Sequence, residues 1–169
     1  MLYLFPTELE AKPFRERHSE RDVVISGVGM VATAATILRL VRSGKIATND
    51  VVLLAGIAGS YGEGVAVGEV VEVVEECCAE LPQRFQERYN VERYTTLRGV
   101  VSNTVHSGAE KGCAAIENME GAALFALAKE YGFRGVEIRA ISNRVGESFE
   151  DWHIAEALEA LAEVLKNIE

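Results

Sequence analysis

Residues 51–60, VVLLAGIAGS, decide the fold, because five apolar residues lead directly into a segment with two glycines. An apolar run without alternating polar residues is typical of a strand that is covered on both faces. The same arrangement occurs upstream, where residues 23–26 (VVIS) lead into Gly27-Val28-Gly29. Residues 136–142 (VEIRAIS) give another such strand. These recurring buried strands predict a largely parallel sheet.

Helical patterns separate the predicted strands. We expect helices over residues 31–42, 118–131 and 151–168, with Gly132 as the C-cap of the second and residues 148–151 (SFED) as a capping box before the third. A short strand is expected at residues 2–5 and a Val-rich strand at residues 65–74, and the polar residues 82–93 are expected to form a surface loop or short helix. The alternation predicts one α/β domain over residues 1–169, with a mixed, largely parallel central sheet flanked by helices.

Composition excludes several classes of protein. The chain has 169 residues, of which 49% are hydrophobic and 25% are charged, as in ordinary globular domains. Its net charge of -9 repels a phosphate backbone, so we expect no nucleic-acid partner. The three cysteines form no disulfide framework, and no Cys/His cluster has zinc spacing, so no metal is expected. The absence of a signal peptide and of a long apolar run favours a cytoplasmic chain without membrane contact.

Four motifs contain candidate site residues: the two glycine segments, the segment around Glu120 and the segment around Asn143. Each lies near the end of a predicted strand or the start of a helix. Ligands of open α/β sheets bind at the carboxyl ends of the strands, so these motifs predict one pocket. The two glycine segments could bring backbone N–H groups to a ligand, or could simply form tight turns. Glu120 could face a sugar or be a solvated first-turn acid, and Asn143 could face a ligand or bond its own turn. Ala32 replaces the last glycine of a dinucleotide motif, so no such cofactor is expected.

The motifs GVGMVATAAT, LLAGIAGSYGEGVAVGEVV, ENMEGAALFALAKEYG and EIRAISNRVGE, in this order, resemble the nucleoside phosphorylase/nucleosidase superfamily. With Asp151-Trp152, Ile154 and Ala157-Leu158, the EIRAISN segment is most similar to the futalosine hydrolase family, which releases hypoxanthine from futalosine in menaquinone biosynthesis. The resemblance covers most of the chain. It implies a purine nucleoside phosphorylase-like fold in shortened form, a small-molecule purine nucleoside as the partner, no cofactor, and a homo-oligomer, dimer or higher.

The resemblance also implies roles for individual residues. Glu120 would hold the ribose 2′- and 3′-hydroxyls, with Met119 packed under the sugar. Glu10, with Glu8 as the alternative, would orient the attacking water. Asn143 would donate to O6 and N7 of the base, where relatives that cleave adenine nucleosides carry Asp. Gly29, Ala58 and Gly59, in the two glycine segments, are further candidates for binding the substrate. Arg144 is a candidate partner for the benzoate of futalosine, or an ordinary surface residue. Trp152 is expected to line that end of the pocket or to pack the last helix.

Alternative functions remain open at this point. Phosphorylases carry Arg and Ser near the second glycine segment, where this chain has Leu54 and Ile57, which favours water over phosphate. The alternatives are a methylthioadenosine/S-adenosylhomocysteine nucleosidase or a purine nucleoside phosphorylase. The chain is short for the family at residues 9–22 and 74–97, so an inactive nucleoside-binding relative is a further alternative. Phe85 and Tyr89 are the candidates for stacking on the base.

Overall fold

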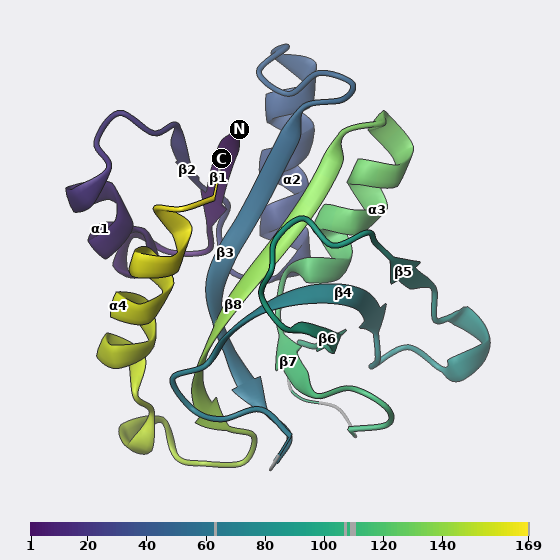
Figure 1. The fold of residues 1–169 in the computed structure, drawn as a ribbon. Helices are drawn as coiled ribbons and strands as arrows, with labels where there is room; N and C mark the ends of the chain where they lie inside the picture. The colour runs from purple at the N-terminus through teal and green to yellow at the C-terminus, as the bar shows by residue number, and fades with distance from the viewer. Residues whose placement is uncertain (63, 107, 109–110, 169) are drawn as a thin grey trace.

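The computed structural model describes residues 1–62, 64–106, 108 and 111–168, and these form a three-layer α/β domain (Figure 1). Within them, eight strands make one mixed sheet, as the sequence predicts. The strands are β1 (Leu2–Phe5), β2 (Val23–Ile25), β3 (Val51–Ser60), β4 (Val70–Cys78), β5 (Arg88–Asn90), β6 (Gly99–Thr104), β7 (Ile116–Asn118) and β8 (Arg134–Arg144). The helices are α1 (Glu8–Arg17), α2 (Gly29–Arg42), α3 (Gly121–Tyr131) and α4 (Ile154–Leu165), with 3-10 turns η1 (Gln83–Phe85) and η2 (Phe149–Asp151).

The centre of the sheet is parallel. β1 pairs in parallel with β2 and β3, and β3 pairs in parallel with β8 along its whole length. β4 runs antiparallel to β8 and parallel to β6, and β6 runs parallel to β7, which closes back on the end of β3. The carboxyl ends of β1, β2, β3 and β8 therefore lie at one edge, where the antiparallel β7 begins, and this edge holds the candidate site.

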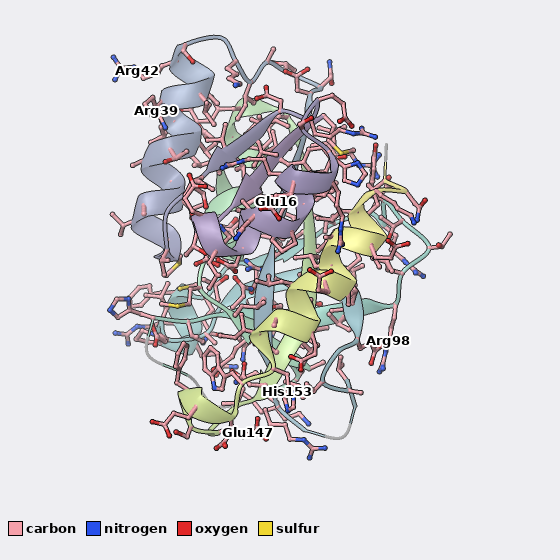
Figure 2. All side chains as sticks on the ribbon, turned by 90° about the vertical axis from the view of Figure 1, so that its left-hand side faces the viewer. Glu16, Arg39, Arg42, Arg98, Glu147 and His153 are labelled. Atoms are coloured by element: carbon pink, nitrogen blue, oxygen red, sulfur yellow. The ribbon has the colours of Figure 1, made fainter. Side chains whose placement is uncertain are left out.

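Helices cover both faces of the sheet, with a separate apolar core under each pair. Between α2, α3 and the sheet lie buried side chains such as Ile37, Leu54 and Phe125. On the other face, α1 and α4 lie side by side, as Figure 2 shows with His153 at the start of α4. That core contains Phe14 from α1 and Leu161 from α4. Burial on both faces explains why the central strands are apolar throughout. No helix in the described ranges is long and apolar enough to cross a membrane.

Most predicted elements are present with shifted ends, but three details are wrong. Residues 8–17 form helix α1, which sequence reasoning missed because the segment is polar and contains Pro13. The predicted capping box at Ser148 instead starts the 3-10 turn η2, with no hydrogen bond from the Ser148 side chain. β6 and β7 were also missed, and Asn118 ends β7 instead of starting a helix. Gly132 is the C-cap of α3, with φ of 72°, as predicted.

Candidate active site

A cavity of about 520 Å³ opens at the carboxyl ends of the strands. Its walls are mainly apolar, and its polar groups come mainly from α1, β7, the start of α3 and the end of β8. An apolar cavity with a few convergent polar groups is the usual form of a small-molecule site. The predicted site residues that line it are Glu10, Ala58, Gly59, Met119, Glu120, Asn143 and Trp152.

Glu120 is the N-cap residue of α3 and is only 3% exposed. Its Oε1 accepts a hydrogen bond from the backbone N–H of Gly29 at 2.9 Å, at the turn where β2 passes into α2. Its Oε2 accepts from Nη2 of Arg139 at 3.1 Å. The predicted residue Gly29 thus orients Glu120 in this structure. The buried carboxylate is held at the cavity wall and is not a solvated first-turn acid.

Glu10 is also buried, at 8% exposure, and lines the cavity from α1. Its Oε1 accepts from the backbone N–H of Ile57 at 3.1 Å, and its Oε2 accepts from Oγ1 of Thr7 at 2.7 Å. Thr7 is the N-cap of α1, so the cap that starts the helix also positions the acid. Burial raises the pKa of Glu10, against the opposite effects of these hydrogen bonds and of Arg139. Glu8, the alternative, is exposed and pairs with Arg15.

Arg139, to which sequence reasoning gave no role, lies between the two acids beneath the cavity. It is 1% exposed and comes from the middle of β8. A Cβ placed on Gly56 would meet Nη1 of Arg139 at 2.7 Å and Oε1 of Glu10 at 2.8 Å, so a glycine is needed for the two to approach. Nη2 also donates to Oδ1 of Asn118 at 3.0 Å. A buried charge requires such partners.

Asn143 lies at the opposite wall, near the end of β8. A register irregularity between Ala58 and Gly59 brings it opposite Gly59 in the ladder. Its Oδ1 accepts from Oγ of Ser142 at 2.8 Å, and its Nδ2 donates to the carbonyl of Arg144 at 3.0 Å. An amide carries two N–H donors, so one N–H of Asn143 remains for a ligand. The other can bind a ligand only after its hydrogen bond to the carbonyl of Arg144 breaks. Glu117, which the sequence analysis did not single out, lines the cavity beside it.

The aromatic residues of this cavity are Phe149 and Trp152, whose ring centroids lie 5.1 Å apart. The stacking candidates lie elsewhere: Phe85 is exposed in η1, and Tyr89 lines a different cavity. Arg144 is exposed and is not among the residues that line the site. Its proposed contact with substrate stays a prediction.

The charged side chains that line the cavity have one sign, and the counter-charge of Arg139 lies beneath them. Glu10, Glu117 and Glu120 line it, whereas none of the described residues that line it is Lys or Arg. Leu54 is fully buried in the core under α2 and α3, and Ile57 presents an apolar side chain to the cavity. Among the described residues, no group of three or more His, Cys, Asp or Glu side chains is arranged to hold a metal ion.

Several known proteins with related sequences or folds are nucleosidases. Futalosine hydrolase from Thermus thermophilus is 30% identical over 212 aligned positions, which cover 99% of this chain and 94% of that protein. Among solved structures, futalosine hydrolase of Helicobacter pylori superposes with a TM-score of 0.82 at 13% identity, over 98% of this chain and 95% of that one. The 5'-methylthioadenosine/S-adenosylhomocysteine nucleosidase of Helicobacter pylori gives a TM-score of 0.81 at 14% identity, with the same two coverages.

The phosphorylase superfamily profile matches residues 72–168, more than half of the chain. This segment contains Met119, Glu120 and Asn143, three of the residues that line the cavity. The fold and the nucleosidase relatives lead to the same assignment. The chain therefore belongs to the phosphorylase superfamily.

Proposed function

We propose that this protein hydrolyses the N-glycosidic bond of a purine nucleoside that carries hypoxanthine, with futalosine as the natural substrate. The observation that carries the proposal is the charge of the cavity: three carboxylates line it, without a Lys or Arg side chain among the described lining residues. Such a site repels a phosphate dianion and admits water. The sequence similarity to a futalosine hydrolase supports the choice of substrate.

Cleavage of the bond develops positive charge on the ribose and negative charge on the departing purine. Glu120, fixed by Gly29 and Arg139, is suited to hold the ribose hydroxyls and to stabilise the positive charge. Glu10 is suited to accept the proton of the attacking water, because its raised pKa brings its basicity toward neutral pH. Met119 would pack against the sugar from the cavity wall.

The preference for hypoxanthine rests on Asn143. A 6-oxopurine presents two acceptors, O6 and N7, and the Asn143 amide carries two donors. An N–H donated to these atoms also stabilises the negative charge on the leaving base. For futalosine, the remaining part of the substrate would extend past Phe149 and Trp152, with the exposed Arg144 as a partner for its benzoate group.

The test is base release from futalosine, inosine, adenosine and methylthioadenosine, each in phosphate-free buffer and with added phosphate. We expect hypoxanthine and the free sugar product without phosphate. Strict dependence on phosphate, with a sugar 1-phosphate as product, would identify a phosphorylase instead. Faster release of adenine would favour the methylthioadenosine-type nucleosidase, to which the fold is also similar. Binding of these nucleosides without any release would favour an inactive nucleoside-binding relative.

A further inference from the structure

Two further carboxyl groups lie behind Arg139, outside the cavity. Glu76 comes from β4 and Glu137 from β8, and both are 0% exposed. A carboxylate without water is costly unless it is paired or hydrogen-bonded. These two acids therefore need a specific arrangement, and the proposed chemistry does not use them directly.

Glu76 and Glu137 meet at the first residue of α3. A Cβ on Gly121 would meet Oε2 of Glu76 and both side-chain oxygens of Glu137, all within 2.8 Å. Both carboxyl groups thus approach the same small volume, which is free because residue 121 is glycine. Oε2 of Glu137 is the buried side-chain atom of the described residues that has no hydrogen-bond donor facing it. A proton on Glu76 would supply that donor.

The two acids differ in their other partners. Nε of Arg139 donates to Oε1 of Glu137 at 2.8 Å, and this guanidinium favours the ionised form of Glu137 against the effect of burial, which raises its pKa. Glu76 accepts from the backbone N–H of Cys77 at 2.9 Å and from Nδ2 of Asn118 at 2.7 Å. Burial and the Glu137 carboxylate raise the pKa of Glu76 to about 8. Of the pair, Glu76 is therefore the member that keeps a proton near neutral pH.

Two chains of neighbouring side chains connect Glu76 to Glu120. One runs through Glu137 to Arg139, whose Nη2 donates to Glu120. The other runs through Asn118, whose Oδ1 accepts from Nη2 of Arg139 at 3.0 Å and from the backbone N–H of Glu120 at 2.8 Å. Both routes end on Glu120, so the pair is arranged to hold the carboxylate that would face the ribose.

We propose that protonated Glu76 donates a hydrogen bond to Oε2 of Glu137, and that this acid–carboxylate pair is a positioning unit that fixes Arg139 and Glu120. The catalytic part of the inference rests on the proposed nucleoside hydrolysis. The existence of the shared proton does not depend on it, and it is tested without substrate.

The charged and titratable groups around the pair set the direction of its pH dependence. Glu137 is influenced by Arg139 and Glu120, while Glu76 acts electrostatically on Tyr61, Cys77 and Cys78. In the unfolded chain Glu76 ionises near 4.5, and in the folded chain its pKa is raised to about 8. Between these values only the folded state keeps the proton, so stability falls as pH rises through this window. Above it, two carboxylates would face each other beside Arg139.

The substrate-free experiment compares the parent with Glu76→Gln and with the control Glu75→Gln. The control makes the same change one residue away, on a side chain that pairs with Arg88 near the surface. We expect the infrared carbonyl band of a protonated carboxyl group in the parent at pH 7 to weaken in Glu76→Gln and to persist in Glu75→Gln. The fall in melting temperature between pH 5 and pH 8 should also become shallower in Glu76→Gln alone. An unchanged band and an unchanged slope in Glu76→Gln would overturn the shared proton.

The activity experiment uses the pH profile of kcat with futalosine or inosine. The parent should lose about tenfold in kcat per pH unit above the pKa of Glu76, because one required proton is lost. Glu76→Gln keeps an N–H donor that does not titrate, in place of the oxygen that accepts from Nδ2 of Asn118, so its turnover should fall moderately while this alkaline decline disappears. Glu76→Leu offers no donor, and kcat should fall on the order of 10- to 100-fold with little change in KM, as for a misplaced catalytic group.

The outcomes separate the two proposals. A parent that releases no base would refute the proposed hydrolysis, while the infrared and stability measurements would still decide the pair. An alkaline decline of the same size in Glu76→Gln and the parent would overturn the positioning role. If Glu76→Leu does not fold, the comparison of Glu76→Gln with Glu75→Gln still decides it.

Discussion

The cavity at the strand ends is smaller than a second cavity of about 740 Å³ between β5 and α3, but the two differ most in their charges. The second cavity is lined by Arg88, Lys129 and Arg134, which are all exposed. Their partners are surface groups: Lys129 pairs with Glu87 at 2.5 Å, and Arg88 pairs with Glu75. Exposed ion pairs of this kind contribute little and are screened by salt.

At the strand ends the charges are buried. The side chain of Arg139 is 1% exposed and forms ion pairs with Glu120 and Glu137. Glu10 lies beside this arginine. Such groups persist only where the surrounding structure supplies partners for each of them, and perturbed groups of this kind cluster at functional sites. In this protein the larger cavity carries exposed and screened charges, whereas the smaller one lies on buried and fully oriented charges, which is the pattern expected of a functional site.

The largest expected effect comes from removing the buried cation. Arg139→Met would leave several buried carboxylates without their counter-charge, and should lower the free energy of unfolding by about 3–5 kcal/mol. The matched change in the second cavity, Arg88→Met, removes an exposed ion pair and should have a much smaller effect. Urea unfolding of both variants measures the difference. Equal losses would contradict the distinction between the two cavities.

Removing a single charge at the cavity wall should act on turnover. Glu120→Gln keeps the size of the side chain but removes the charge that would face the electron-deficient ribose, and kcat should fall on the order of 100-fold or more. Glu130→Gln is the control, because Glu130 is exposed on the same helix. Initial rates of hypoxanthine release measure both. A near-parent rate for Glu120→Gln would remove Glu120 from the site.

The next effect concerns the base that would activate water. Because burial raises the pKa of Glu10, the parent should lose kcat/KM as pH falls through that raised value, where the carboxyl group takes up a proton. Glu10→Gln should lower kcat, leave substrate affinity largely intact and flatten this acidic limb. Glu8→Gln, on the exposed neighbour, should keep the parent profile. An acidic limb that survives in Glu10→Gln would assign the proton to another group.

The smallest expected effect is a change of preference. Asn143→Asp replaces the amide donors by a carboxyl group, which can accept from an adenine amino group and donate to N7 when protonated. The ratio of kcat/KM for inosine to that for adenosine should therefore fall, mainly through slower cleavage of inosine. This ratio tests whether the residue at the β8 end of the cavity selects the base. A parent that prefers adenosine would contradict the assignment of Asn143.

The sequence predicts those parts of the fold in which local pattern and packing agree. β3 and β8 are buried on both faces, and their apolar runs predict them. α4 has a regular apolar face and is found where expected, with shorter ends. α1 was missed because its stability comes from the Thr7 cap and from packing of Phe14, neither of which gives an apolar period. β6 and β7 are short strands whose pairing depends on distant segments.

The site residues also divide into those with a recognisable sequence pattern and those without one. Glu10, Glu120 and Asn143 were predicted because they match motifs of a known superfamily, and the fold brings all three to one cavity. Glu76 and Glu137 were missed, since charged residues in a strand are usually taken as solvent-facing. A signal was available in Glu137 and Arg139, which lie two residues apart within an apolar run and so point to the same buried face.

Gly121 restricts the order in which amino-acid substitutions can accumulate in this region. A methyl group at that position would collide with the carboxyl groups of both Glu76 and Glu137, so Gly121→Ala is blocked while both side chains keep their length. After both acids are shortened, the same alanine would have room, and its methyl group would fill part of the space that they leave. The effect of one substitution thus changes sign with the identity of the other two residues. Among homologues, residues 76, 121 and 137 should therefore change together.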